Sequence, residues 1–241
     1  MRISVCIITK DEAEMLKWAL RHYSSFADEI VVYDNQSTDG TQDAIKACAK
    51  ARREPYDTCG VLRDDVHLKI KNDFAPDADW RIIVDTDELL WHPAGVRRYL
   101  ERCTPMGVTL PHTTGWNMIG DGWPQDDGTT QLWELVRDGV PCNHFYAKKC
   151  VVKRDVAIQY SVGCHGCQPK GLVVYSPTIE LKVLHYKWLN PQWTLERMRR
   201  TQEQLSEQNK ENGWGTRNEA NSVEQEAAYY EKSKREKVRV T

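Results

Sequence analysis

The chain has no uninterrupted apolar run approaching the ~20 residues that a bilayer-spanning helix needs. It also shows no signal peptide, because the short apolar segment 3–9 leads directly into charged residues. We therefore expect a cytoplasmic protein without a transmembrane segment. With a net charge of −2 over 241 residues, the chain has no global basic excess, which would indicate nucleic-acid binding, and no long acidic block, which would indicate a solvating tail.

Glycine is missing from one informative place, the turn Thr9–Glu14 after the first expected strand. This absence excludes both the dinucleotide-binding fingerprint and a P-loop, in which glycines let the backbone approach phosphates closely. A phosphate-bearing ligand would have to be held in another way, and a divalent cation is one such way.

Apolar, β-branched segments alternate with amphipathic ones in the first third of the chain. Residues 3–9 and 29–34 are typical of strands, each followed by a helical pattern, and residues 82–85 form a later strand. Asp11 and Glu14 have the spacing of a capping box, so a helix is expected to start there. The order predicts an α/β fold with a parallel sheet and right-handed crossovers.

The strand at 82–85 ends in three carboxylates, Asp85, Asp87 and Glu88. In open α/β sheets, ligands bind outside the carboxyl ends of the strands, and two aspartates one residue apart can offer oxygens to Mg²⁺ or Mn²⁺. The alternative is that Asp85 and Asp87 cap a helix beginning near Leu89.

Four segments together resemble glycosyltransferase family 2, which has the GT-A fold: Ile7–Glu12, Val32–Thr41, Trp80–Glu88 and His185–Trp188. The resemblance is strongest over the first half of the chain and is closest to a compact subgroup with an Asp-x-Asp-Glu motif and a late His-Tyr-Lys. It implies a mainly parallel central sheet flanked by helices, with residues 1–190 as the transferase domain. Residues 191–241 would form a C-terminal helical extension and polar tail.

The same resemblance implies an inverting transfer of a sugar from a nucleotide-diphosphate donor to a hydroxyl of a glycan, protein, lipid or modified nucleic acid. The residues that match its donor-binding positions are Thr9, Asp11, Glu12, Asp34, Asp85 and Lys187. Asp85 and Asp87 would hold Mn²⁺ or Mg²⁺, and His185, at a strand end, is a reasonable third ligand. The alternatives are that Asp34 is a turn former and that His185 is a core histidine.

A hydroxyl acceptor needs a general base, and the candidate acids lie in and after segment 113–124, which we expect to be a loop because it is rich in Gly and Trp. They are Asp121, Asp126, Asp127 and Glu134, with Asp121 preferred. The Glu-Asp pair usual in the wider family is not recognisable. Trp116 and Trp123 would stack on a sugar or base, or fill the core.

Eight cysteines without a secretion signal indicate reduced thiols or metal ligands instead of disulfides. Cys142, Cys150, Cys164 and Cys167 are a candidate structural zinc site, with His144 and His165 nearby and a C-x₂-C spacing in the second pair. The alternatives are buried free thiols and, by the resemblance, a His165 that faces donor or acceptor.

Two other functions remain open from the sequence. A nucleotidyltransferase shares the sheet and the metal chemistry, although it usually carries a glycine-rich loop where Thr9–Glu14 stands. A zinc-containing module that binds nucleic acid through the basic segment Lys232–Arg239 is the second, and a glycosyltransferase acting on modified DNA would combine both ideas.

Overall fold

Two five-stranded sheets organise the chain in the computed structural model, which describes residues 1–142, 147–215 and 220–241. The first sheet has the order β3-β2-β1-β4-β8. Its strands are β1 (Ile3–Thr9), β2 (Glu29–Asp34), β3 (Ala51–Pro55), β4 (Trp80–Asp85) and β8 (Val151–Lys153). The first four run parallel, and β8 is antiparallel to β4.

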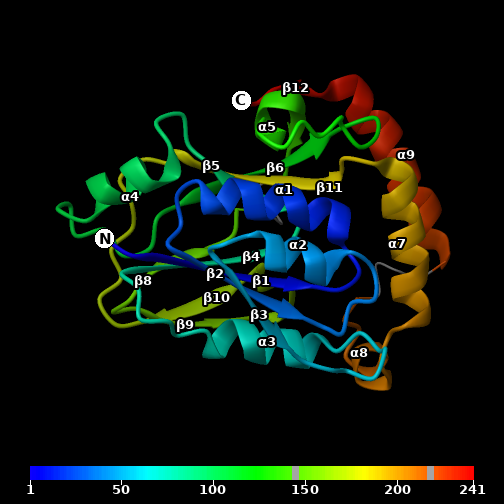
Figure 1. Cartoon of the computed structure of the whole chain (residues 1–241), viewed down its shortest axis with the longest axis horizontal. Helices are drawn as coiled ribbons and strands as arrows, with labels where there is room; N and C mark the ends of the chain where they lie inside the picture. Colours follow the sequence, from blue (N-terminus) through cyan, green and yellow to red (C-terminus); the bar gives the residue numbers. More distant parts are fainter. Residues whose placement is uncertain (143–146, 216–219) are drawn as a thin grey trace.

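Both faces of this sheet are buried, which explains the continuous apolar runs in its sequence. Helices α1 (Ala13–Ser24) and α2 (Thr41–Ala47) cover the face toward the second sheet, and α3 (Asp64–Asp73) covers the other (Figure 1). Val5 and Ile7 of β1 pack in the cluster that includes α1, whereas Cys6 packs in the cluster on the α3 side. The period-2 alternation of a strand thus supplies both layers.

The second sheet has the order β12-β7-β6-β11-β5 and stands beyond α1 (Figure 1). Its strands are β5 (Glu88–Trp91), β6 (Thr113–Ile119), β7 (Asp138–Pro141), β11 (Leu181–Trp188) and β12 (Val238–Arg239). Strands β6 and β11 are parallel, and the other neighbours are antiparallel.

Two local predictions were wrong in this sheet. The expected loop at 113–124 begins with strand β6, and no helix starts near Leu89, because Glu88–Trp91 is strand β5. Strand β6 pairs with β11 along most of its length and with β7 over Trp116–Met118, and this tertiary context outweighs the low strand propensity of glycine.

The remaining elements are α4 (Val96–Cys103), α5 (Leu132–Leu135), β9 (Ala157–Tyr160), η1 (Val162–Cys164), β10 (Cys167–Lys170), α7 (Pro191–Glu203), α8 (Glu207–Glu211) and α9 (Ala220–Glu236). Helix α7 crosses the end of the molecule toward which β1 points, and α9 lies outside it (Figure 1). Asn190 caps α7 by accepting a hydrogen bond from the Trp193 backbone N–H at 3.1 Å.

The start of α1 is fixed from a distance and not by the expected capping box. The helix begins at Ala13, whose N–H donates to Asp39 Oδ2 at 3.0 Å. Glu14 pairs with Lys17 at 2.7 Å, and Asp11 has a φ of +48°. The loop after β2 therefore caps the helix after β1.

The predicted class is confirmed: a mixed α/β fold with a mainly parallel sheet, flanking helices and further helices at the C-terminus. A domain division at residue 190 stays a prediction, although β12 joins the second sheet by pairing with β7. None of the helices in the described ranges has the length and apolarity to cross a bilayer.

Candidate functional site

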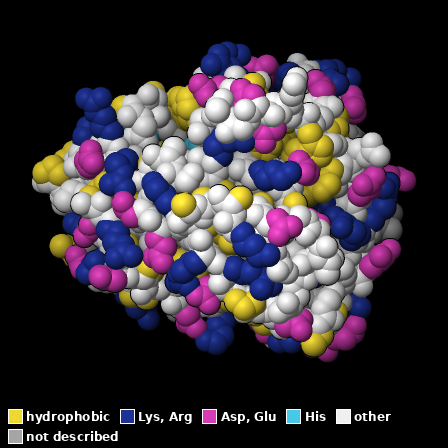
Figure 2. Space-filling view, viewed as in Figure 1, with side chains coloured by type: hydrophobic (Ala, Val, Ile, Leu, Met, Phe, Trp, Pro, Cys, Tyr) yellow, Lys and Arg dark blue, Asp and Glu magenta, His cyan; other side chains and the backbone are white. Residues whose placement is uncertain are grey.

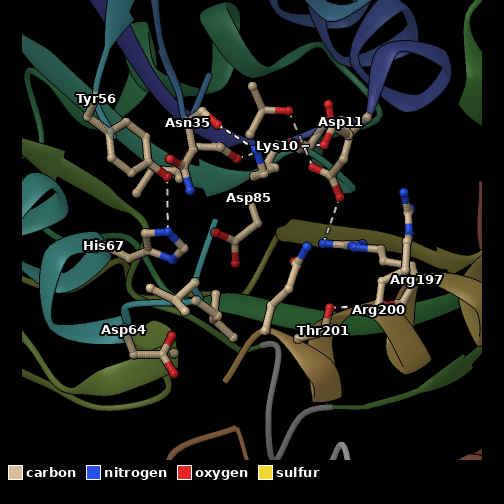
Figure 3. A pocket seen from close by; sticks show the side chains of 18 of the residues that line it. Lys10, Asp11, Asn35, Tyr56, Asp64, His67, Asp85, Arg197, Arg200 and Thr201 are labelled. Atoms are coloured by element: carbon tan, nitrogen blue, oxygen red, sulfur yellow. Dashed lines mark hydrogen bonds and ion pairs between the residues drawn. The ribbon is translucent and has the colours of Figure 1, made fainter. Parts of the chain in front are cut away.

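A cavity of about 290 Å³ lies at the carboxyl ends of β1 and β4, between them and helix α7. Its polar and charged lining includes Thr9, Lys10, Asp11, Glu12, Asn35, Tyr56, Asp64, His67, Lys71, Asp85, Arg197, Arg200 and Thr201. Asp85 points into it from the sheet, and Arg197 and Arg200 project from the opposite wall (Figure 3). The volume is just below the roughly 300–1,000 Å³ typical of small-molecule sites.

Asp85 is held by two lysine side chains. Lys71 Nζ lies 2.5 Å from Oδ1, and Lys148 Nζ lies 3.3 Å from Oδ2 and also pairs with Glu88. The second Glu88 oxygen accepts the Asp85 backbone N–H at 3.1 Å. Burial disfavours the ionised carboxylate, but the two ammonium groups outweigh it and hold the pKa of Asp85 well below its usual value.

Asp87 and His185 meet because of strand register. The antiparallel pairing of β5 with β11 sets His185 opposite Glu88, beside the end of the Asp-x-Asp segment. His185 Nε2 lies 3.5 Å from Asp87 Oδ2, and both side chains are buried. The sequence placed them 98 positions apart, and only the sheet brings them together.

Arg197 of α7 joins two of these carboxylates. Its guanidinium lies 2.7 Å from Glu12 Oε1 and 3.2 Å from Asp87 Oδ2. Burial alone would raise the pKa of Asp87, yet His185 and Arg197 together hold it well below its usual value. Sequence reasoning missed this residue, because helix α7 carries three arginines and nothing in the sequence distinguishes Arg197 as the one that contacts Glu12 and Asp87.

The far wall of the cavity is a neutral hydrogen-bonded pair. Burial lowers the pKa of His67 to about 4, so the ring is uncharged, and its Nε2 shares a hydrogen bond with the Tyr56 hydroxyl at 3.0 Å. Asn35 fixes the neighbouring loop, since its amide donates to Thr58 Oγ1 at 2.8 Å and accepts from the Thr58 N–H at 3.2 Å. This wall therefore presents neutral polar groups to the cavity, next to the charged side chains of Asp85 and Lys71.

The structure places only some of the predicted donor-binding residues around the cavity. Thr9, Asp11, Glu12 and Asp85 line it. Asp34 does not line it: the side chain is fully buried, its Oδ2 accepts from Arg53 Nε at 2.6 Å, and its Oδ1 accepts from the Ser37 N–H at 3.0 Å. That carboxylate orders the turn after β2, as its alternative interpretation expects.

Lys187 also lies outside the cavity lining, because Nζ pairs with Glu226 of α9 at 2.7 Å. A donor-binding role for Lys187 or Asp34 stays a prediction.

The candidate general bases are engaged elsewhere. Asp121 pairs with Lys234 at 2.6 Å and accepts from the Tyr230 hydroxyl at 3.1 Å. Glu134 completes a capping box with Gln131 at the start of α5. Asp126 pairs with Arg21, and Asp127 accepts backbone N–H groups of its own turn. None of the four lines the cavity, so a catalytic role for them stays a prediction.

The three predicted metal ligands are not brought together as a set. Asp87 and His185 are adjacent, whereas both Asp85 oxygens contact lysine ammonium groups. Within residues 1–142, 147–215 and 220–241, no group of three or more His, Cys, Asp or Glu side chains is arranged to hold a metal ion. A role of Asp85 as a direct metal ligand therefore stays a prediction without support from these contacts. The sequence did not reveal that Lys71 and Lys148 would occupy both of its oxygens.

Cys142, Cys150, Cys164 and Cys167, the proposed zinc ligands, do not belong to any group of three or more metal-ligating side chains in the described part of the chain. Burial raises the pKa of Cys150 to about 12, which keeps it protonated. His144 lies outside the described residues. Three of the five basic side chains of the tail lie near carboxylates: Lys234 pairs with Asp121, Lys232 lies 3.9 Å from Glu236 and Arg239 lies 3.8 Å from Asp138.

Charges of both signs are interspersed on the face shown in Figure 2, where no continuous basic surface is visible. Binding to nucleic acid depends mainly on such a surface.

No family model matches the chain, and no curated protein matches it. Among solved structures, it is similar to glucosyl-3-phosphoglycerate synthase from Mycobacterium tuberculosis, with a TM-score of 0.34 and 19% identity over 47% of this chain and 44% of that one. S. aureus TarS gives 0.44 and 14% over 83% and 64%. A 4-diphosphocytidyl-2C-methyl-D-erythritol synthase from Anaerococcus prevotii gives 0.34 and 14% over 64% and 70%. The chain thus spans less than half of the mycobacterial enzyme. The description of its fold above rests on its own sheet topology.

Proposed function

We propose that this chain is a GT-A-type glycosyltransferase that moves a sugar from a nucleotide-diphosphate donor to a hydroxyl acceptor with inversion. The observation that carries the proposal is the set of carboxylates Glu12, Asp85 and Asp87 at the carboxyl edge of a parallel sheet, beside a cavity of small-molecule size; Glu12 and Asp87 are buried, and Asp85 is partly exposed. This edge is where open α/β sheets bind ligands. The mycobacterial synthase has been crystallised with Mn²⁺, uridine diphosphate and phosphoglyceric acid.

In this proposal, the residues of the strand ends orient the donor. Thr9 and Asp11 would contact base and ribose, and Asp85, held rigid by its two lysines, would accept hydrogen bonds from donor hydroxyls. Lys71 and Arg197 would stabilise negative charge that develops on the departing diphosphate, since preorganised cations in a water-poor site act strongly on such charge. The neutral pair Tyr56 and His67 would exclude water from one side.

Asp87 and His185 fit a divalent cation in donor chemistry. A carboxylate oxygen and an imidazole nitrogen 3.5 Å apart are ligand types that Mn²⁺ accepts. When bound, such a cation would neutralise phosphate charge and so assist departure of the leaving group. Asp85 would act beside it and not as a ligand, because its two oxygens face ammonium groups that are almost fully buried, whereas the Arg197 guanidinium at Asp87 is 36% exposed and can turn away.

A panel of sugar nucleotides with Mn²⁺ tests the proposal, with donor hydrolysis and thermal shift as the two readouts. We expect one donor to stabilise the protein, and Asp87→Asn and Asp85→Asn to abolish turnover while the fold is kept. Asp155→Asn, an exposed position, is the matched control. Wild-type rates in both site variants, with no effect of a chelator, would refute the proposal. Release of pyrophosphate when a nucleoside triphosphate and a sugar phosphate are supplied in place of the sugar nucleotide would indicate a nucleotidyltransferase.

A further inference from the structure

A fully buried asparagine holds Asp64 at the edge of the cavity. Asn209 of α8 donates from Nδ2 to Asp64 Oδ2 at 2.9 Å, and its Oδ1 accepts the Asp64 backbone N–H at 3.2 Å. The backbone contact fixes the orientation of the amide, since a flipped amide would set its NH₂ group against an N–H group. Both polar atoms of the Asn209 side chain are therefore used on one residue, 145 positions earlier in the chain.

The backbone around these two residues is docked as well. The Leu62 N–H donates to the Gln204 carbonyl at 2.6 Å, and the Ser206 N–H donates to the Leu62 carbonyl at 3.3 Å. Ser206 also caps α8, because its Oγ accepts the Asn209 N–H at 3.1 Å. The segment that follows α7 thus fixes the residues that precede α3, and Asn209 extends this contact to a side chain of the cavity.

One oxygen of the Asp64 carboxylate stays available to a ligand. Oδ2 is engaged with Asn209, whereas Oδ1 has no hydrogen-bond partner in the part of the chain that the structure describes. Asp64 lines the cavity, on the same side as Tyr56 and His67 (Figure 3). Burial raises the pKa of Asp64 above its usual value, so a ligand N–H group would stabilise the carboxylate.

The alternative is that Asp64 serves only helix α3, in whose first turn it lies. Acidic residues there stabilise a helix through its macrodipole. Asp65 lies in the same turn, and its carboxylate accepts from Arg63 at 2.8 and 2.7 Å and does not line the cavity. A role confined to the helix would be shared by both aspartates, so a comparison of the two separates the roles.

The cavity is aromatic and apolar on one side and cationic on the other. Its lining near Asp64 includes Tyr56, Leu62, His67 and Leu68. Helix α7 supplies Arg197 and Arg200 on the opposite side (Figure 3). A nucleoside diphosphate is divided in the same way, into a flat base and a charged diphosphate. We therefore expect the base to lie beside Asp64 and the diphosphate to point toward α7.

We infer that Asp64 selects the nucleobase of the donor by accepting a hydrogen bond from a ring N–H group, and that Asn209 is its positioning residue. This role rests on the proposed function and deepens it by naming the class of base. Uracil and guanine carry a ring N–H on the edge that they offer to a protein. Cytosine and adenine carry an unprotonated ring nitrogen there, and its lone pair repels a carboxylate oxygen. A site built for an N–H group rejects a ligand that lacks it.

The substitution Asp64→Asn should reverse this preference. Asn209 Nδ2 would still donate to the carbonyl oxygen of the new amide, so an NH₂ group would take the place of Oδ1. That group repels a ring N–H and donates to an unprotonated ring nitrogen. The change keeps the size of the side chain and its contact with Asn209, and alters only what the side chain presents to the base.

The experiment is isothermal titration calorimetry of the full chain with the diphosphates of uridine, guanosine, cytidine and adenosine, with Mn²⁺ present in every titration. We expect the wild type to bind the uridine or guanosine compound about 10–100-fold more tightly than the other two, as one hydrogen bond to a charged group allows. Asp64→Asn should bind the cytidine or adenosine compound at least as tightly as the other two. Asn209→Ala should show a weaker preference than the wild type, and Asp65→Asn, the control, should keep it.

Equal affinities of the wild type for the four nucleotides would overturn the inference while the proposed function stands. The same holds for a preference that persists in folded Asp64→Asn, or that Asp65→Asn loses to the same extent. An unchanged preference in folded Asn209→Ala would overturn the positioning role of that residue.

Thermal unfolding without nucleotide reports the fold of each variant. Should Asp64→Asn not fold, the wild type is titrated with uridine or guanosine diphosphate methylated at the ring N–H, and an affinity equal to that for the unmodified nucleotide contradicts the inference. A wild type that binds none of the four nucleotides would refute the proposed function itself.

Discussion

Replacing Arg197 by methionine tests whether a cation is needed between Glu12 and Asp87. The guanidinium is the group that bridges these carboxylates, at 2.7 and 3.2 Å, and both are only 6% exposed. Methionine keeps much of the length of the side chain and removes the charge. The variant therefore leaves two buried carboxylates facing each other.

Removing one partner of a buried ion pair typically costs about 3–5 kcal/mol. Arg197 is 36% exposed, so water can replace part of its effect, and His185 still faces Asp87. We therefore expect a loss of about 2–3 kcal/mol in the free energy of unfolding, at and below the lower end of that range. For a chain of this size, the loss corresponds to a fall in Tm of roughly 5–10 °C.

Calorimetry in EDTA measures the loss of stability without a metal, and calorimetry in excess Mn²⁺ measures how much of that loss a bound cation restores. In EDTA, Arg197→Met should melt below wild type, whereas Arg199→Met, an exposed neighbour on α7, should not. Mn²⁺ should raise the Tm of Arg197→Met more than that of wild type, because a ligand stabilises most where it relieves repulsion and meets no competitor for Asp87. A Tm in EDTA within about 2 °C of wild type, or an equal gain from Mn²⁺ in both proteins, would refute the bridge.

Three further changes test other parts of the molecule. Burial lowers the pKa of His22 to about 4, so on acidification the unfolded chain binds this proton before the folded one does. The contribution of this group to the free energy of unfolding is therefore complete above pH 6.5 and falls by roughly 3 kcal/mol as the pH approaches 4. Urea unfolding of His22→Gln between pH 7 and 4.5 should show a flatter decline than wild type, and parallel profiles would contradict this. Lys71→Met should lower stability by an amount near the bottom of about 3–5 kcal/mol, since Asp85 keeps its second lysine; it should also weaken donor-induced thermal shift, and unchanged values in both would count against the role of Lys71. Asp39→Ala should lower the free energy of unfolding, measured in urea, by about 1 kcal/mol through loss of the α1 cap, while Glu14→Ala should have little effect. A larger loss in Glu14→Ala than in Asp39→Ala would instead support the capping box expected from the sequence.

Local patterns predicted the parts of the fold that depend on short-range chemistry. The segments 3–9 and 29–34 are strands β1 and β2 over the same residues, and β4 contains 82–85. The carboxylates of Asp85 and Asp87 follow directly, so their place at the sheet edge could be read from the order of the residues. The α1 cap could not, because Asp39 reaches it from a loop 26 residues away.

The cations around the site were unpredictable for the same physical reason. Lys71 lies on a helix whose sequence is mostly polar, and Lys148 precedes an edge strand, yet their side chains are 8% and 2% exposed. A lysine is normally solvated, so only a tertiary contact with Asp85 or Glu88 justifies its burial. The register that joins His185 to Asp87 likewise depends on β11, which pairs with β5 in a sheet that no local pattern specified.

The cations around the carboxylates divide the site into two halves that differ in how easily the cation can move away. Asp85 and Glu88 are neutralised by lysines that are almost fully buried, whereas Asp87 and Glu12 contact a guanidinium of helix α7 that is 36% exposed. A buried ammonium cannot leave without stranding a carboxylate, but a partly exposed guanidinium can turn toward solvent or toward a phosphate at a smaller cost. We therefore expect an incoming cation and diphosphate to exchange places with Arg197 at Asp87 and to leave the lysine half unchanged. A crystal structure with Mn²⁺ and a nucleoside diphosphate in which Lys71 has left Asp85, while Arg197 still bridges Glu12 and Asp87, would show that the halves are assigned the wrong way round.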